Sequence, residues 1–354
     1  MFLLTVIIFS PIQAGFSDRY CRKKSVIVSL SLSAFSVMII LWSQNTYFSI
    51  FALFLIIFSK GVVGNTQPIS LAGVADRKLN NIRFSMALCT GAMAAGYLVL
   101  IIFQKLLSET QASLTLLILF ALIIILCILF FRDIRDKEGK TLETTPTSST
   151  YNLLKQEVKL VLQETILVKE ELKSKRLQKA LLIFAFWEIS QYSVHCLNID
   201  LRIGKFSNLT TAMVLGYLIG LFILSFFKKS SDYSTIRIGY AICLLSVVPF
   251  FILDPFLDNG KPLLLGCYFF YNLGTVFLAP SLFSILAGEK PSHEQGKIFG
   301  LLDSTDTIAF LIATCVAIAY FSLDLPDAFI TAFSSIILFL SWFIFKSFEC
   351  STFP

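Results

Sequence analysis

Long apolar runs alternate with short polar gaps along the whole chain. Most runs reach about 18 residues, the length at which an apolar α-helix can cross the hydrocarbon core of a bilayer. The runs are continuous and lack the two-residue alternation of barrel strands, so the pattern predicts helices. Eleven membrane helices are expected, at residues 1–14, 25–43, 47–71, 84–103, 113–131, 179–201, 208–227, 237–254, 262–288, 297–320 and 327–345.

Composition supports the same fold class, an all-α membrane protein built as a helical bundle. Hydrophobic residues make up 56% of the chain, against roughly 45–50% in soluble domains. The lipid bilayer is therefore the first expected partner. The loops carry no nucleotide-binding motif, paired catalytic motif or metal cluster, so we do not expect an enzyme.

The distribution of the basic residues, which give the chain a net charge of +6, indicates its orientation in the membrane. Of the 29 Lys and Arg residues, 24 lie in alternate loops and the C-terminal tail, and four lie in the opposite loops. Basic residues gather on the cytoplasmic side of short loops. We therefore predict a plasma (bacterial inner) membrane protein with a cytoplasmic C-terminus and central loop. This scattered charge does not suit nucleic acid.

A polar stretch at 132–178 divides the apolar segments into two groups. Its second part, from Tyr151 to Arg176, has apolar residues on one helical stripe among Lys and Glu. That pattern is typical of a linker helix that is solvated or lies on the membrane surface. The expected domains are a transmembrane half at 1–131, the linker at 132–178 and a second half at 179–354.

Cysteine and histidine usage indicates neither metal nor cofactor. The eight cysteines are scattered without a CxxC motif, and the only histidines are His195 and His293. This spacing matches no zinc site or disulfide framework. We predict no metal and no cofactor, and the oligomeric state cannot be read from the pattern.

The loop after the first apolar run reads AGFSDRYCRK. It resembles the signature loop between helices 2 and 3 of the major facilitator superfamily, in which Asp18, Arg19, Arg22 and Lys23 match the charged positions. Ala14 and Cys21 replace two family glycines. The resemblance implies that these charged residues form a cytoplasmic latch that must break before the site opens inward.

A second match lies in the next segments. Lys60 followed by Gly64 resembles the family's basic residue and glycine, and Pro68, Asp76 and Arg83 also stand at comparable family positions. The GxxxGP antiporter signature is absent, which favours uptake or symport.

The resemblance covers nearly the whole chain and implies two pseudo-symmetric halves, a site near the bilayer midplane and alternating access. In that scheme the first helix is missing, because only fourteen residues precede the signature loop. They give about 21 Å of helix, less than a bilayer core of about 30 Å. We therefore expect a chain that lacks helix 1.

Two ionisable residues lie inside predicted spans, at matching depth. Lys60 and Glu188 both fall on helices that the resemblance places around the cavity. Charged groups in a span are costly and usually functional. The hypothesis is that protonation of Glu188 releases Lys60 and so couples protons to transport; the alternative is a structural pair or two separate groups.

Polar stripes mark candidate substrate contacts. Glu188, Tyr192 and His195 recur at helical spacing on one face. Tyr268, Tyr271 and Asn272 share a face of a later helix and are either substrate contacts or interfacial anchors. Asp303 and Asp306 lie nearer the cytoplasm, and we expect them to latch onto Arg19 or Arg22.

The predicted function is secondary active transport of a small polar or charged solute by alternating access, with protons as the coupling ion and uptake as the favoured direction. Two alternatives stay open. One is a truncated remnant or scaffold that does not transport, and the other is a drug or metabolite exporter.

Overall fold

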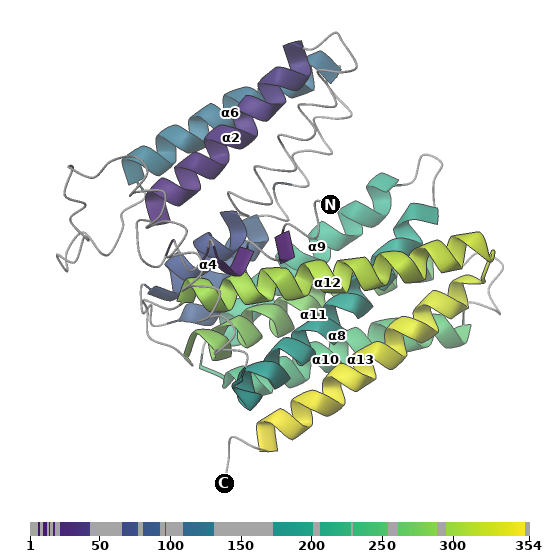
Figure 1. Cartoon of the computed structure of the whole chain (residues 1–354). Coiled ribbons are helices and arrows are strands. Elements are labelled where there is room, and N and C mark those ends of the chain that lie inside the picture. Colours follow the sequence, from purple (N-terminus) through teal and green to yellow (C-terminus); the bar gives the residue numbers. More distant parts are fainter. Residues whose placement is uncertain are drawn as a thin grey trace. The chain divides into compact units, whose positions relative to one another are not determined.

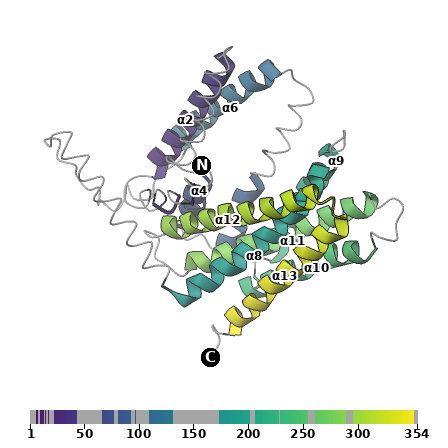
Figure 2. The same cartoon turned by 45° about the vertical axis from the view of Figure 1, so that its right-hand side comes forward.

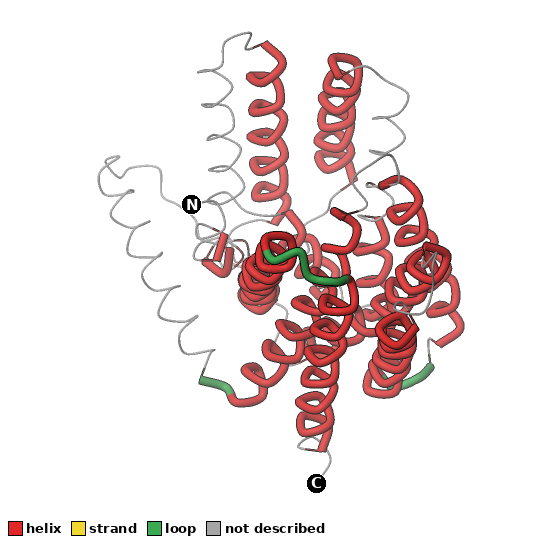
Figure 3. The backbone as a smooth tube through the Cα atoms, turned by 90° about the vertical axis from the view of Figure 1, so that its right-hand side faces the viewer, coloured by secondary structure: helices red, strands yellow, loops and turns green. Residues whose placement is uncertain are grey.

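The structure is a computed structural model in which helices account for almost every described residue (Figures 1 and 3). No strand occurs in the described ranges, so the predicted all-α fold class is confirmed. The described residues are 6–7, 10–12, 14, 17, 22–42, 66–76, 81–92, 96, 109–130, 173–200, 206–227, 229–253, 261–288 and 295–350.

Nine α-helices have described bounds, and each coincides with or overlaps a predicted span. They are α2 (Arg22–Trp42), α4 (Thr66–Asp76), α6 (Glu109–Phe130), α8 (Lys175–Asp200), α9 (Phe206–Leu224), α10 (Asp232–Leu253), α11 (Lys261–Gly288), α12 (Gln295–Ser322) and α13 (Asp327–Cys350). The 3-10 turn η3 (Ser225–Phe227) continues α9.

The chain forms two compact units. The first comprises 1–78, 104–175 and 290–304, and the second comprises 79–103, 176–289 and 305–354. Helix α12 contributes residues to both. The predicted division at 132–178 stays a prediction.

In the first unit, α2 packs along α6 and also contacts α4 (Figures 1 and 2). The beginning of α12 approaches the N-terminal segment closely. A Cβ added at Gly300 would lie 2.6 Å from Pro11 Cα and 2.8 Å from the Ser10 carbonyl oxygen. Glycine at this position therefore permits backbone contact between segments almost 300 residues apart.

In the second unit, α11 packs against α9 and α10, and α10 packs against α13. Small residues allow these helices to approach. A Cβ at Gly216 would overlap the Phe269 carbonyl, and one at Gly239 would lie 2.9 Å from the Gly274 carbonyl oxygen. Tyr240 and Tyr268 are among the largest side chains that are fully buried.

Three described segments are long and apolar enough to cross a membrane, namely Leu263–Gly288, Gln295–Ser322 and Ala328–Cys350. Large apolar side chains also remain exposed, including Leu129 on α6, Phe222 on α9 and Phe343 on α13. Exposed apolar surface of this kind suits contact with lipid.

Two glycines of α11 give a matched test of this packing. At Gly274 an added Cβ would lie 2.6 Å from Cys243 Sγ and 3.0 Å from the Cys243 backbone nitrogen. At Gly266 an added Cβ would have no described atom of a neighbouring residue within 4 Å. We expect Gly274→Ala to destabilise the protein by about 1–3 kcal/mol through overpacking. Gly266→Ala should be neutral or slightly stabilising, because alanine favours helix.

The measurement is the thermal unfolding temperature of both variants in detergent. Equal unfolding temperatures for the two variants would show that the close approach of α10 and α11 does not limit stability.

Candidate functional site

Helix α8 contains the polar residues that were predicted from the sequence as substrate contacts. Hydrogen bonds of Ser190 hold this helix against its neighbours. The Ser190 hydroxyl shares hydrogen bonds with Tyr271 Oη (3.0 Å) on α11 and with Ser334 Oγ (2.7 Å) on α13. Ser334 also donates to the Ser190 carbonyl at 3.1 Å. All three side chains are fully buried. This network joins three helices through polar groups that satisfy one another.

Glu188 and Tyr192 lie on another side of α8. Tyr192 donates a 2.8 Å hydrogen bond to Asp306 Oδ1 on α12, and its ring meets Phe310 edge to face at 5.2 Å. Glu188 is buried, with 8% of its surface exposed. It lies within electrostatic range of Asp306 and of the Tyr271 hydroxyl. Two acidic groups and two tyrosines therefore share this region.

The outer part of the stripe contacts α11. The rings of His195 and Tyr268 stack at 5.7 Å, and Tyr268 Oη donates to the Val194 carbonyl at 2.8 Å. Asn272 is buried, and its amide donates to the Tyr268 carbonyl one turn earlier at 2.8 Å. The three predicted residues of α11 therefore have different partners. Tyr268 and Tyr271 contact α8, whereas Asn272 donates a hydrogen bond within its own helix.

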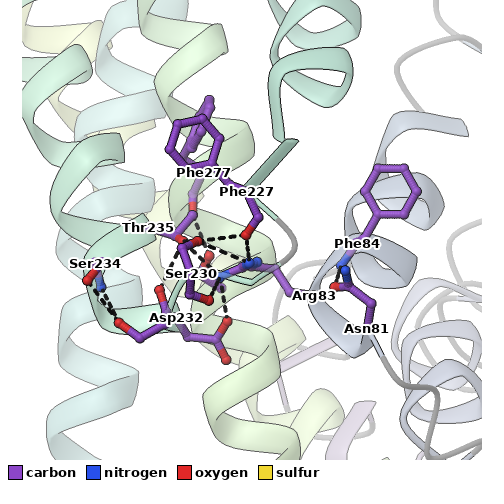
Figure 4. Close-up of polar contacts among 11 residues, drawn as sticks. Asn81, Arg83, Phe84, Phe227, Ser230, Asp232, Ser234, Thr235 and Phe277 are labelled. Atoms are coloured by element: carbon purple, nitrogen blue, oxygen red, sulfur yellow. Dashed lines mark hydrogen bonds and ion pairs between the residues drawn. The ribbon is translucent and has the colours of Figure 1, made fainter. Parts of the chain in front are cut away.

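A further polar cluster surrounds Arg83 (Figure 4). From the sequence alone, Arg83 was identified only as a residue that stands at a position comparable to one in the resembled family. Arg83 is buried, and Nη1 donates to Asp232 Oδ1 (2.9 Å), to Thr235 Oγ1 (2.8 Å) and to the Ser230 carbonyl (3.2 Å). Nη2 donates to the Phe227 carbonyl and to Ser230 Oγ. The guanidinium thus binds the turn between η3 and α10 from several sides.

Local sequence explains this placement. The side chain of Asn81 accepts a 3.1 Å hydrogen bond from the backbone N–H of Phe84, as at a helix N-cap, and so sets the start of the helical residues 82–92.

At Asp232, burial raises the pKa above its usual value, while the Ser284 hydroxyl and Arg83 favour the charged carboxylate.

In the first unit the signature loop forms a local ion pair. Arg22 Nε donates to Asp76 Oδ2 at 2.6 Å, and Arg22 Nη1 donates to Ser17 Oγ at 3.2 Å. Lys23 Nζ donates to the Ile128 carbonyl of α6. The loop's second arginine therefore joins the beginning of α2 to the end of α4.

The two aspartates of α12 have different partners. Asp303 accepts a 2.6 Å hydrogen bond from Ser10 Oγ in the first unit, whereas Asp306 accepts from Tyr192 in the second. Lys60, Asp18 and Arg19 lie outside the described residues. The latch of the aspartates onto Arg19 or Arg22 and the pairing of Lys60 with Glu188 both stay predictions.

Sequence reasoning missed Ser190, Ser334 and Arg83 as organising residues. Serine is common in membrane helices, where it can bond to its own helix backbone, so only the clustering of polar residues around Glu188 gave a signal. Ser334 gave none, because Thr331, Ser335 and Ser341 stand in the same helix and the sequence does not distinguish one of these hydroxyls from another.

The Arg83 cluster generates a stability prediction. We expect Arg83→Lys to lower the free energy of unfolding by about 1–3 kcal/mol, which corresponds to a fall of several degrees in the unfolding temperature. The reason is that a single ammonium group cannot make the several hydrogen bonds that the two guanidinium nitrogens make. Arg237→Lys is the matched control, since Arg237 pairs with Glu349 but keeps 49% of its side chain exposed. Thermal unfolding in detergent measures both, and an equal loss would contradict a special role for Arg83.

Solved structures similar to this chain are transporters. The human organic anion transporter MFSD10 (TETRAN) has a TM-score of 0.69 at 17% identity, over 97% of this chain and 82% of that chain. The E. coli fucose:proton symporter FucP has a TM-score of 0.66 at 13% identity, over 98% and 89%. The proton:xylose symporter XylE has a TM-score of 0.69 at 14% identity, over 96% and 82%. At these identities the likeness shows a shared fold.

The sequence comparisons identify the family. None of the curated proteins compared matches the sequence. The family model described as Major Facilitator Superfamily matches residues 1–314. That match confirms the resemblance carried by the signature loop, and the chain is an integral membrane protein that belongs to the major facilitator superfamily.

Proposed function

We propose that this protein is a secondary active transporter that moves a small polar or charged solute together with protons by alternating access. Membership of the superfamily supports transport. The arrangement around α8 supports coupling, since it holds an acidic pair, Glu188 and Asp306, beside polar and aromatic side chains. Transport of this kind requires binding and conformational change and no covalent chemistry.

The single observation that carries proton coupling is the 2.8 Å hydrogen bond from Tyr192 to Asp306, because Tyr192 lies one helical turn from Glu188 on α8 and so brings the two carboxylates into electrostatic range. Two carboxylates in electrostatic range repel when both are ionised, and a proton bound to one of them removes that repulsion. In the described part of the chain, no basic side chain forms an ion pair with Glu188. Tyr192 holds Asp306 by a hydrogen bond and so fixes one member of the pair.

The similar structures support the same coupling, because two of them are proton symporters, for fucose and for xylose. The organic anion transporter widens the range of possible solutes. We further propose that the protein lies in the plasma membrane with its C-terminus in the cytoplasm, as its loop charges indicate.

Glu188→Gln tests the proposal. In proteoliposomes that contain a pH-sensitive dye, xylose, fucose and an organic anion serve as probe solutes. We expect the wild type to take up protons with one of them. Glu188→Gln should reduce this proton uptake and proton-driven accumulation at least about tenfold, while exchange of labelled for unlabelled solute continues, because exchange requires no net proton movement.

Glu349→Gln is the matched control, since Glu349 is also buried but pairs with Arg237. It should retain proton uptake. Full proton-driven accumulation in the Glu188→Gln variant would refute the role of Glu188.

A further inference from the structure

Three buried polar atoms of α8 have no hydrogen-bond partner among the residues that the structure describes. They are Trp187 Nε1, Gln191 Oε1 and His195 Nε2. Unpaired buried polar atoms are rare in native proteins. Three of them in one helix therefore need an explanation.

The three residues recur at intervals of four. Each interval advances about 6 Å along a helix and turns about 40° around its axis. Trp187, Gln191 and His195 therefore form one narrow strip, called here the α8 strip. On one side it borders the packed face, where Ser190 bonds to Tyr271 and Ser334. On the other side it borders Glu188 and Tyr192, which belong to the acidic region.

Neighbouring rings hold the strip in place. The Trp187 ring lies 5.6 Å from that of Phe184, and the His195 ring stacks on Tyr268 at 5.7 Å. Trp187 is 2% exposed, so the atoms packed around its ring hold the indole N–H in a fixed position. The polar atoms are thus positioned in advance, and the part of the chain that the structure describes supplies no partner for them.

We infer that the α8 strip binds the hydroxyl groups of a neutral polyhydroxylated solute, and that this solute class is the substrate; the inference rests on the proposed transport function. The indole N–H can only donate, the Gln191 amide oxygen can only accept, and neutral His195 Nε2 does one or the other according to its tautomer. A hydroxyl donates and accepts, so one functional group satisfies all three.

Charged solutes match the strip less well. A carboxylate only accepts, so it would leave Gln191 Oε1 unpaired and would lie near the acidic Glu188. An ammonium only donates, so it would leave the Trp187 N–H unpaired. Water has the donor and acceptor capacity of a hydroxyl and fills the strip when the solute leaves. The hydroxyls of a polyol would replace such waters while the surrounding rings contact its C–H groups.

The test is equilibrium binding to the purified full chain in detergent, without any transport step. The probes are xylose, fucose and myo-inositol as neutral polyols, succinate as an anion whose carboxylates only accept, and putrescine as a cation whose ammonium groups only donate. We expect at least one polyol to bind saturably and to raise the unfolding temperature, and the two ions to do neither.

Gln191→Leu should weaken that binding about tenfold, which is the usual effect of losing one buried hydrogen bond and leaving a solute hydroxyl unpaired. Trp187→Phe should have a similar effect. The matched controls are Gln178→Leu, on an exposed part of α8, and Trp342→Phe, on α13, and both should bind as the wild type does. Size-exclusion profiles show which variants remain folded.

Binding of succinate or putrescine but no polyol would overturn this inference and leave proton-coupled transport standing. Polyol binding unaffected by both strip variants would also overturn it, as would the absence of binding by all three polyols. The proton uptake assay in liposomes tests the coupling separately, so failure of one proposal does not imply failure of the other.

Discussion

The constraint on which this structure depends is that a polar group removed from water needs a partner. In a bilayer this forces the backbone into helices, and it also governs the side chains of α8. Ser190 meets the requirement through hydroxyls on α11 and α13, which fixes the position of α8 between them. On the neighbouring side of α8, Trp187, Gln191 and His195 each keep one buried polar atom without a partner among the described residues, and the proposed solute would supply those partners.

Much of the fold was predictable because lipid imposes length and hydropathy on each span. Helices α11 and α12 agree with their predicted ranges to within two residues at each end. The disagreements lie where helices continue beyond the apolar run. Helix α13 extends to Cys350, five residues past its predicted end, and there Glu349 pairs with Arg237 of α10. Hydropathy predicts only the part of a helix that lies in the lipid core. It does not predict how far the helix continues into the polar region beyond, as α13 does here.

The candidate site was predictable only in part, for a related reason. Periodicity placed Glu188 and Tyr192 on neighbouring positions of one stripe, since that spacing follows from the helix alone. The partner of Tyr192, Asp306, lies 114 residues away, and its contact depends on how α12 is rotated. Asp303 and Asp306, three residues apart, were expected to act together. They are separated by about 60° around the helix axis, which is enough to give them different partners, Ser10 and Tyr192.

Close backbone packing explains how α8 can be held in place and also carry the proposed binding strip. The glycine contacts of α9, α10 and α11 leave little room for these helices to shift against one another, as shown by the contact of Gly239 with the Gly274 carbonyl. Helix α11 in turn holds α8 through Tyr268 and Tyr271. A solute that binds to α8 therefore meets groups already fixed in place, so less of its binding energy is lost in ordering side chains. In the proposed transport function, that energy is available to favour one conformation of the protein over another.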